Sequence, residues 1–125
     1  MDTYLKLWLN HVPLSVNRVL RMHWAKRHNY NAIWVDEVFA AKNEIKLWGR
    51  PEHTDVTVRI RLFYSGQVAM DEDNLVASCK PIIDALVKNG ILLDDSPDHV
   101  RGVTVSQTKT RPKDTGVSIA IEPVD

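Results

Sequence analysis

The sequence predicts an α/β protein of the α+β type, in which a mixed β-sheet carries two main helices in the order β-α-β-α-β-β. Two observations predict this class. Short segments with alternating apolar and polar residues are typical of strands, and two longer segments with apolar residues at helical spacing are typical of helices. The 125 residues are 44% hydrophobic and 26% charged, without repeats or low-complexity linkers, so we expect one globular domain over residues 1–125.

The first half of the chain predicts a strand, a helix and a second strand. Residues 3–9 place Leu5, Leu7 and Leu9 on one face, as in a strand, and loop chemistry follows at residues 13–17. A helix is expected over roughly Asn31–Leu47, closed by Gly49 and Pro51. Its apolar residues recur at helical spacing: Trp34, Val38, Ala41, Ile45 and Trp48. Residues 54–64 alternate strictly and form the clearest strand.

The second half predicts a helix and two further strands. Asp73 is expected to cap the helix, Gly90 to end it, and Pro81 to kink it or split it in two. Residues 103–110 and 117–121 predict strands. Because the loop between them is short, we expect them to form a hairpin.

Charge is unevenly distributed, although sixteen Lys and Arg balance sixteen Asp and Glu. Residues 1–66 hold ten basic and six acidic side chains, whereas residues 67–99 hold two basic and seven acidic. The zero net charge therefore does not exclude a polyanionic partner. The lone Cys79 excludes an intramolecular disulfide and a multi-cysteine metal site, and favours a small core residue. Without an apolar run of roughly 20 residues or a signal peptide, we expect a cytoplasmic protein and no membrane partner.

The acidic segment predicts a site for a hard cation. Asp71 and Asp73 alternate in a stretch that we expect to be extended, so both carboxylates point to one side. Mg²⁺ prefers oxygen ligands and usually takes one or two carboxylates together with water and substrate phosphate. Asp95 supplies a third carboxylate if its turn folds back onto the first. A plainer interpretation stays open, in which residues 71–74 are a solvated loop with a helix cap and residues 94–97 an exposed turn.

Lys80 is one of the two basic residues in this acidic segment. It forms an i,i+4 pair with Asp84, and both lie on the same helix face as Asp73. A lysine beside metal-bound carboxylates contacts a scissile phosphate or stabilises charge on a leaving oxygen. Lys80 is therefore a candidate phosphate contact if the carboxylates hold a metal ion.

The acidic segment also contains motifs with a characteristic spacing. It reads Asp71-x-Asp73-Asn74-Leu75, then Lys80-x-x-x-Asp84-x-Leu86, then Gly90 and the Asp94-Asp95 pair, preceded far upstream by Pro13-Leu14-Ser15-Val16-Asn17-Arg18. In these motifs the sequence resembles the RusA family of Holliday-junction resolvases over about residues 3–110. Members of that family are small, magnesium-dependent, homodimeric endonucleases that are common in bacteriophages and prophages.

The resemblance implies a site and an activity. It implies metal-binding, catalytic carboxylates at Asp71, Asp73 and Asp95, with Mg²⁺ as the cofactor and Mn²⁺ as its substitute, and a catalytic lysine at Lys80. Supporting residues around them are Asn74, Asp84 and Asp94. It further implies a homodimer that cuts four-way junctions by paired phosphodiester hydrolysis in recombination and repair, in the cytoplasm of a bacterial or phage-infected cell.

The sequence departs from the family pattern at three places. The stretch from Asn74 to Lys80 is longer than in the family. Met70 stands where a basic residue often precedes the first aspartate, which removes a phosphate contact. Glu72 replaces an apolar residue, and we expect its side chain to point away from the site.

Candidate DNA-binding residues lie in a basic segment that we expect to be a DNA-facing loop and on the predicted final hairpin: Arg18, Arg21, His23, Lys26 and Arg27, and Lys109 and Arg111. The alternative is a solvated basic loop. In that loop, Trp24 or Tyr30 stacks on an unpaired base or has an ordinary core or capping role. Arg59 and Arg61 share a strand face, either as a further DNA contact or as residues that keep an exposed sheet face soluble.

Three functions remain open on these grounds. The first is the junction-resolving endonuclease. The second is a related nuclease that acts on other branched or flap DNA, and the third is a catalytically inactive protein that binds branched DNA. Magnesium-dependent cleavage of a synthetic four-way junction separates them.

Overall fold

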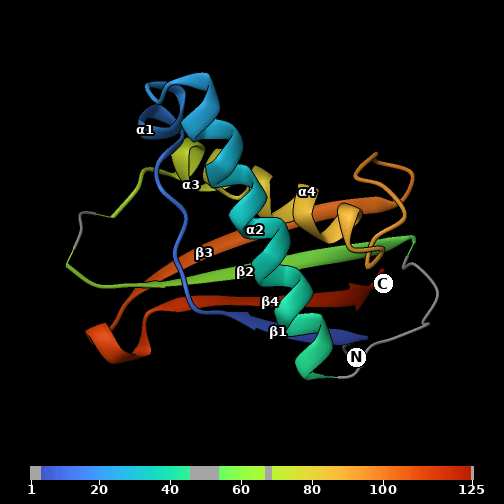
Figure 1. Ribbon diagram of the computed structural model, residues 1–125. Helices are drawn as coiled ribbons and strands as arrows, with labels where there is room; N and C mark the ends of the chain where they lie inside the picture. Colours follow the sequence, from blue (N-terminus) through green and yellow to red (C-terminus); the bar gives the residue numbers. More distant parts are fainter. Residues whose placement is uncertain (1–3, 46–53, 67–68, 125) are drawn as a thin grey trace.

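The structure, a computed structural model, describes residues 4–45, 54–66 and 69–124. Its centre is a four-stranded mixed β-sheet with the strand order β1-β4-β2-β3 (Figure 1). The strands are β1 (Leu5–Leu9), β2 (Val56–Tyr64), β3 (Val100–Lys109) and β4 (Gly116–Pro123). The helices are α1 (Val16–Leu20), α2 (Trp24–Glu44), α3 (Glu72–Ser78) and α4 (Lys80–Lys88). The predicted mixed α+β class is confirmed, with α1 as an additional short helix.

The last two strands do not form the predicted hairpin, because β2 lies between them. Ile60 of β2 lies opposite Val105 of β3 in a parallel pair and opposite Ile119 of β4 in an antiparallel pair. The connection contains a short 3₁₀ helix, η1 (Pro112–Asp114). Composition explains the arrangement: β4 buries most of its side chains and takes an inner position, whereas the largely polar, exposed β3 suits the edge of the sheet.

The segment that was expected to be a basic loop is helical. The Ser15 hydroxyl accepts a hydrogen bond from the backbone N–H of Arg18 (3.3 Å) and caps α1. α2 begins at Trp24 and not at Asn31, and His23 Nδ1 caps it by accepting from the backbone N–H of Ala25. The predicted start was wrong because hydrophobic periodicity does not report the polar first turns of a capped helix.

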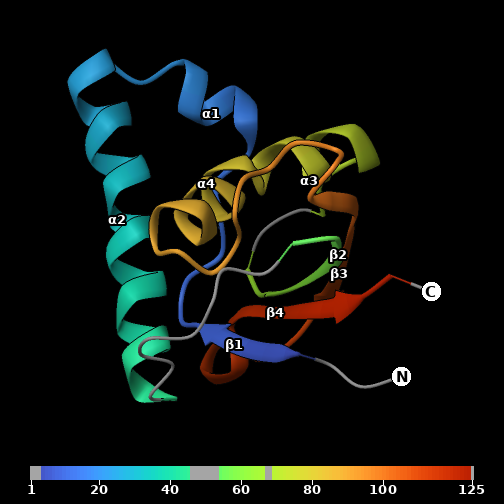
Figure 2. The same cartoon turned by 90° about the vertical axis from the view of Figure 1, so that its right-hand side faces the viewer.

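The face of α2 that packs on the sheet is the predicted one. Trp34, Val38 and Ala41 are buried, whereas Ile45, just after the last helical turn, is 45% exposed. The predicted end of this helix lies outside the described residues: Leu47, Trp48, Gly49 and Pro51. Figure 2 shows α2, α3 and α4 on one side of the sheet.

The predicted second helix is split in two at Cys79. Pro81 lies in the first turn of α4, where its missing N–H costs no helical hydrogen bond. Gly90 follows α4 with a φ of 71°, and its N–H donates to the Val87 carbonyl at 3.0 Å. A left-handed glycine at this position ends many helices. The split at Pro81 and the end at Gly90 are therefore confirmed.

One hydrophobic core joins the sheet to α2, α3 and α4. Cys79 belongs to this core with 1% of its surface exposed, and burial raises the pKa of its thiol to about 11. Its prediction as a small core residue is confirmed. Among the helices that the structure describes, none combines the length and the hydropathy that a membrane crossing requires.

Candidate active site

The acidic segment begins α3 and is not extended as predicted. Asp71 has extended dihedral angles (φ −68°, ψ 165°) and is the N-cap, because its Oδ1 accepts from the backbone N–H of Asn74 at 2.8 Å. Glu72 and Asp73 lie in the first helical turn, where carboxylates are favourable. The predictions that Asp73 caps the helix and that strand alternation aligns it with Asp71 are therefore wrong.

A side chain from the edge strand β3, 37 residues further along the chain, holds the start of this helix. Gln107 of β3 accepts from the backbone N–H of Met70 (3.1 Å) and donates to its carbonyl (2.6 Å). These two bonds fix the residue immediately before Asp71 to the edge strand. Sequence reasoning missed Gln107, because no local pattern connects residues this far apart.

The carboxylates at the start of α3 line an open hollow of about 570 Å³. Val16 and Asn17 of α1 form the opposite wall. Glu72 lines the same hollow, so the expectation that it points away is wrong: consecutive residues of a helical turn do not alternate between two faces as they do in a strand.

A second hollow of about 180 Å³ continues from the first. The two share Val16 and Ala77, and the second is also lined by Lys80, Pro81 and Asp84. Together they form a groove between α1 on one side and α3 and α4 on the other, which we call the acidic groove. Asp71, Glu72 and Asp73 therefore lie at one end of the groove, and Lys80 lies with Asp84 at the other.

The Lys80 ammonium lies between two carboxylates. Its Nζ is 3.1 Å from Asp84 Oδ1 and donates to Asp95 Oδ2. The contact with Asp95, followed by that with Asp84, raises the pKa of Lys80, and Lys80 lowers the pKa of Asp95. The predicted i,i+4 pair is confirmed, and Lys80 is fully charged at neutral pH.

Asp94 shapes the turn that presents Asp95. Its Oδ1 accepts from the Ser96 backbone N–H at 2.8 Å, and this bonding to Ser96 lowers the pKa of Asp94. Its Oδ2 lies 3.5 Å from His99 Nε2, and His99 Nδ1 is hydrogen-bonded to the hydroxyl of Thr54. This chain of contacts ties the turn to the residues before β2. Sequence reasoning assigned no role to His99.

The three predicted metal ligands are not gathered into one cluster. Asp71 and Asp73 line the acidic groove, whereas the carboxylate of Asp95 is bound by Lys80. Among the described residues, no three His, Cys, Asp or Glu side chains are grouped as metal ligands. Asn74 also lines the groove, and its Oδ1 is buried without a hydrogen-bond partner. The groove therefore offers oxygen donors, the kind that Mg²⁺ prefers.

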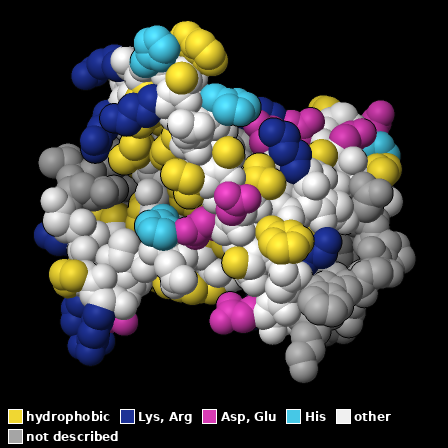
Figure 3. All heavy atoms as spheres, viewed as in Figure 1, with side chains coloured by type: hydrophobic (Ala, Val, Ile, Leu, Met, Phe, Trp, Pro, Cys, Tyr) yellow, Lys and Arg dark blue, Asp and Glu magenta, His cyan; other side chains and the backbone are white. Residues whose placement is uncertain are grey.

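Four of the predicted DNA-binding residues surround one hollow of about 380 Å³ where α1 meets α2: Arg18, Arg21, His23 and Lys26. We call this surface the basic corner. Arg27 follows in the first turns of α2, and Figure 3 shows basic and histidine side chains gathered at this end of the molecule. Among the described carboxylates, none forms an ion pair with Arg18, Arg21 or Lys26. The cations are therefore available to an anionic ligand.

The two aromatic residues predicted beside these cations have different surroundings. Trp24 is 70% exposed, and its ring centroid lies 5.6 Å from that of His23. The Tyr30 hydroxyl accepts from the Leu14 backbone N–H (2.9 Å), and its ring stands edge-on to Trp34. Tyr30 therefore supports the core, whereas Trp24 is free of it.

The remaining predicted cations lie on the sheet or in the connection from β3 to β4, which is not a hairpin. Lys109 is the last residue of β3, and Arg111, in the connection that follows, pairs with Asp114 at 3.0 Å. On β2, Arg59 lies 3.4 Å from Glu122.

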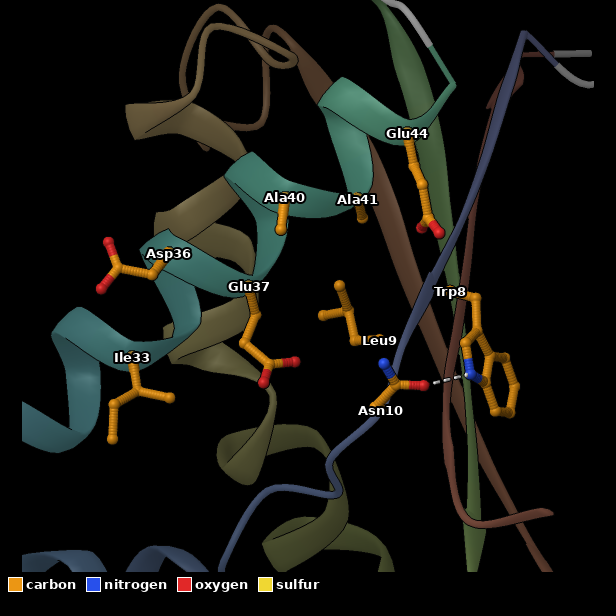
Figure 4. A pocket seen from close by; sticks show the side chains of 9 residues that line it. All are labelled: Trp8, Leu9, Asn10, Ile33, Asp36, Glu37, Ala40, Ala41 and Glu44. Carbon is orange, nitrogen blue, oxygen red and sulfur yellow. Dashed lines mark hydrogen bonds between the residues drawn. The ribbon is translucent and has the colours of Figure 1, made fainter. Parts of the chain in front are cut away.

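A separate hollow of about 310 Å³ lies between β1 and α2 (Figure 4). Asp36, Glu37 and Glu44 contribute carboxylates to it, and Glu37 is paired with His11. Its lining includes none of the site residues predicted from the sequence.

A scan of the sequence against models of protein families finds no match, and a search among curated proteins finds no similar sequence. A functional assignment therefore depends on the groove geometry and on the motifs.

Proposed function

We propose that this protein is a magnesium-dependent, structure-specific endodeoxyribonuclease that resolves Holliday junctions, like the RusA family that its motifs resemble. The observation that carries this proposal is the position of Lys80. Its ammonium group contacts two carboxylates at one end of a groove whose other end is lined by Asp71 and Asp73. In metal-assisted phosphodiester hydrolysis, oxygen donors hold the metal ion and a nearby fixed cation stabilises the negative charge that develops.

The proposed metal ligands are Asp71, Asp73 and Asp95. The donor set at the start of α3 suits Mg²⁺, because this ion takes one or two protein carboxylates and fills its other positions with water and phosphate. The unpartnered Oδ1 of Asn74 is a further oxygen beside them. When bound, Mg²⁺ or its substitute Mn²⁺ supplies charge neutralisation at the phosphate and a more acidic water.

Lys80 has the role of an electrostatic group in this proposal. Its raised pKa keeps the ammonium protonated, so it stabilises negative charge on the phosphate or on the departing 3′ oxygen. Asp84 orients it through the i,i+4 contact, and Asp94 supports the turn that carries Asp95.

The basic corner is the proposed contact to the DNA backbone. α1 lies between it and the acidic groove: Val16 and Asn17 line the groove, whereas Arg18 and Arg21 line the corner. A DNA strand that crosses α1 therefore meets cations before it reaches the carboxylates, and this neutralisation supplies much of the affinity. Lys109 and Arg111 are proposed as a more distant contact.

A homodimer completes the proposal. Two-fold assembly is the commonest oligomeric arrangement, and two copies bring two grooves to one branch point, so that paired nicks are made. The setting that we propose is the cytoplasm of a bacterial or phage-infected cell.

Cleavage of a synthetic four-way junction tests the proposal. Asp71→Ser removes the carboxylate but keeps an oxygen that accepts from the Asn74 N–H, so α3 remains capped. We expect Asp71→Ser, Asp73→Asn and Lys80→Gln each to lower the rate by about 100-fold or more with Mg²⁺. Asp36→Asn, which removes one carboxylate from the separate hollow beside β1, is the matched control and is expected to cut at the wild-type rate.

The alternatives give different results in the same assay. A wild-type protein that binds the junction and never cuts it with Mg²⁺ or Mn²⁺ is the inactive DNA-binding protein, and the enzyme proposal fails. Equal cutting of flaps or linear duplex refutes specificity for junctions. Sedimentation at a mass near 14.3 kDa at micromolar concentration contradicts the homodimer.

A further inference from the structure

The face of the sheet turned away from the helices carries aromatic and basic side chains. In β1 and β2 the buried residues alternate with exposed or half-buried ones and belong to the core shared with the helices, which lie on one side of the sheet in Figure 2, so the alternate residues point the other way. Strand register places Trp8 opposite Ser118, Ser118 opposite Arg61, and Phe63 opposite Gly116. We call this surface the open sheet face, defined by Lys6, Trp8, Arg59, Arg61, Phe63, Gly116, Ser118, Ala120 and Glu122.

Two aromatic rings and one guanidinium lie in contact on this face. The ring centroids of Trp8 and Phe63 are 5.8 Å apart with 41° between their planes. The guanidinium carbon of Arg61 lies 5.7 Å from the centroid of the Phe63 ring. Trp8 lies over Gly116, since an added Cβ there would come within 2.3 Å of Trp8 Cζ2. The rings therefore rest on a strand of small residues, and Trp8 is still 43% exposed.

The charge on the open sheet face is positive. Lys6, Arg59 and Arg61 are exposed, and Glu122 is the only carboxylate among the residues of the four described strands. Glu122 pairs with Arg59, which leaves Lys6 and Arg61 as the cations that flank the rings. A polyanion with flat apolar groups matches this combination of charge and shape.

We propose that the open sheet face binds single-stranded DNA, with bases stacked on Trp8 and Phe63 and phosphates held by Lys6 and Arg61. Unpaired bases stack on exposed aromatic side chains of a sheet with little sequence preference, whereas bases inside a duplex are not available for it. The face uses no residue of the acidic groove, so its binding requires neither a metal ion nor cleavage. Only the choice of DNA over RNA rests on the proposed function.

Fluorescence anisotropy with a labelled oligo(dT) in EDTA tests this proposal. We expect Trp8→Ala to weaken binding about tenfold, the equivalent of one lost stacking contact. Arg61→Gln is expected to weaken binding and to reduce the slope of log affinity against log salt by about 0.7, because one phosphate contact is lost. Phe39→Ala and Lys88→Gln are matched controls on the helical side, and neither should change the affinity.

Several results overturn the proposal. One is unchanged oligo(dT) affinity in both Trp8→Ala and Arg61→Gln, with their folds checked by circular dichroism. Tighter binding of oligo(rU) than of oligo(dT) overturns the assignment to DNA. Self-association that Arg61→Gln abolishes, without oligonucleotide binding, assigns the face to a second copy instead. EDTA removes the metal ion that cleavage would need, so the anisotropy experiment measures binding alone. Its result therefore does not depend on whether the nuclease proposal holds.

Discussion

At Gly116, the first residue of β4, the structure leaves no space for a side chain. A Cβ at this position would lie 2.3 Å from Trp8 Cζ2 and 2.6 Å from the backbone oxygen of Leu9. The indole is able to rotate away, but the Leu9 carbonyl is not free to move, because Leu9 pairs with Val117 in the β1–β4 ladder. We therefore expect Gly116→Ala to force β1 and β4 apart locally.

The size of this effect follows from the overlap. Restoring an ordinary separation to the Leu9 oxygen requires a backbone shift of about 1 Å, and overpacking of this kind typically costs 1–3 kcal/mol. Because the obstacle is backbone, we expect a loss of about 3 kcal/mol in the free energy of unfolding. For a chain of this length that corresponds to a fall in Tm of about 12 °C.

Thermal unfolding followed by circular dichroism measures this fall, and Gly102→Ala is the matched control. Gly102 also lies in a strand, β3, but an added Cβ there meets no atom within 4 Å. We expect its Tm to stay within about 3 °C of the wild type, with a small gain from reduced chain entropy. The reasoning is refuted if Gly116→Ala has the same Tm as the wild type, or if Gly102→Ala lowers the Tm as much as Gly116→Ala does.

Three further predictions concern the cap of α3, the buried thiol and the turn before β3. Asp71→Ala is expected to lower the free energy of unfolding by about 1 kcal/mol and Asp71→Ser by less, because the hydroxyl still caps α3; urea titration distinguishes them. Cys79, whose thiol has a pKa of about 11, is expected to react with a thiol reagent at pH 8 only in urea. The stability that the buried, protonated thiol contributes is present below pH 9 and is lost as the pH rises toward 11. Thermal unfolding curves of the wild type at alkaline pH that match those of Cys79→Ala contradict this. His99→Ala is expected to lower the rate of junction cleavage, because Asp94 loses its contact with His99, and His99→Gln is expected to restore part of that rate. Equal cleavage rates in the wild type, His99→Ala and His99→Gln contradict this positioning role.

Local sequence patterns predicted the features that local forces decide. The alternation of β2, the break at Pro81, the end at Gly90 and the contact between Lys80 and Asp84 all depend on residues within a few positions of one another. Backbone geometry and side-chain burial act at that range, so their patterns are visible in the sequence.

The wrong predictions concern positions where two nearby residues can both cap a helix, or where residues far apart in the sequence come into contact. Both Asp71 and Asp73 are able to cap a helix, and the contact between Gln107 and Met70 holds the chain so that Asp71 takes the position. The hairpin prediction failed because chain proximity favours pairing of neighbouring strands, whereas the burial of β4 between β1 and β2 outweighs it.

The strand order has a consequence for the sequence of events in folding. Among the strands that the structure describes, β1 pairs with β4 alone, so Leu5 finds its partner Ile121 near the opposite end of the sequence. During synthesis β1 therefore stays without a strand neighbour until the last strand has left the ribosome, and closing such a long loop slows folding. We expect a nascent chain that stops within η1 to expose both edges of β1 and one edge of β2, and to depend on chaperones until β4 inserts between them.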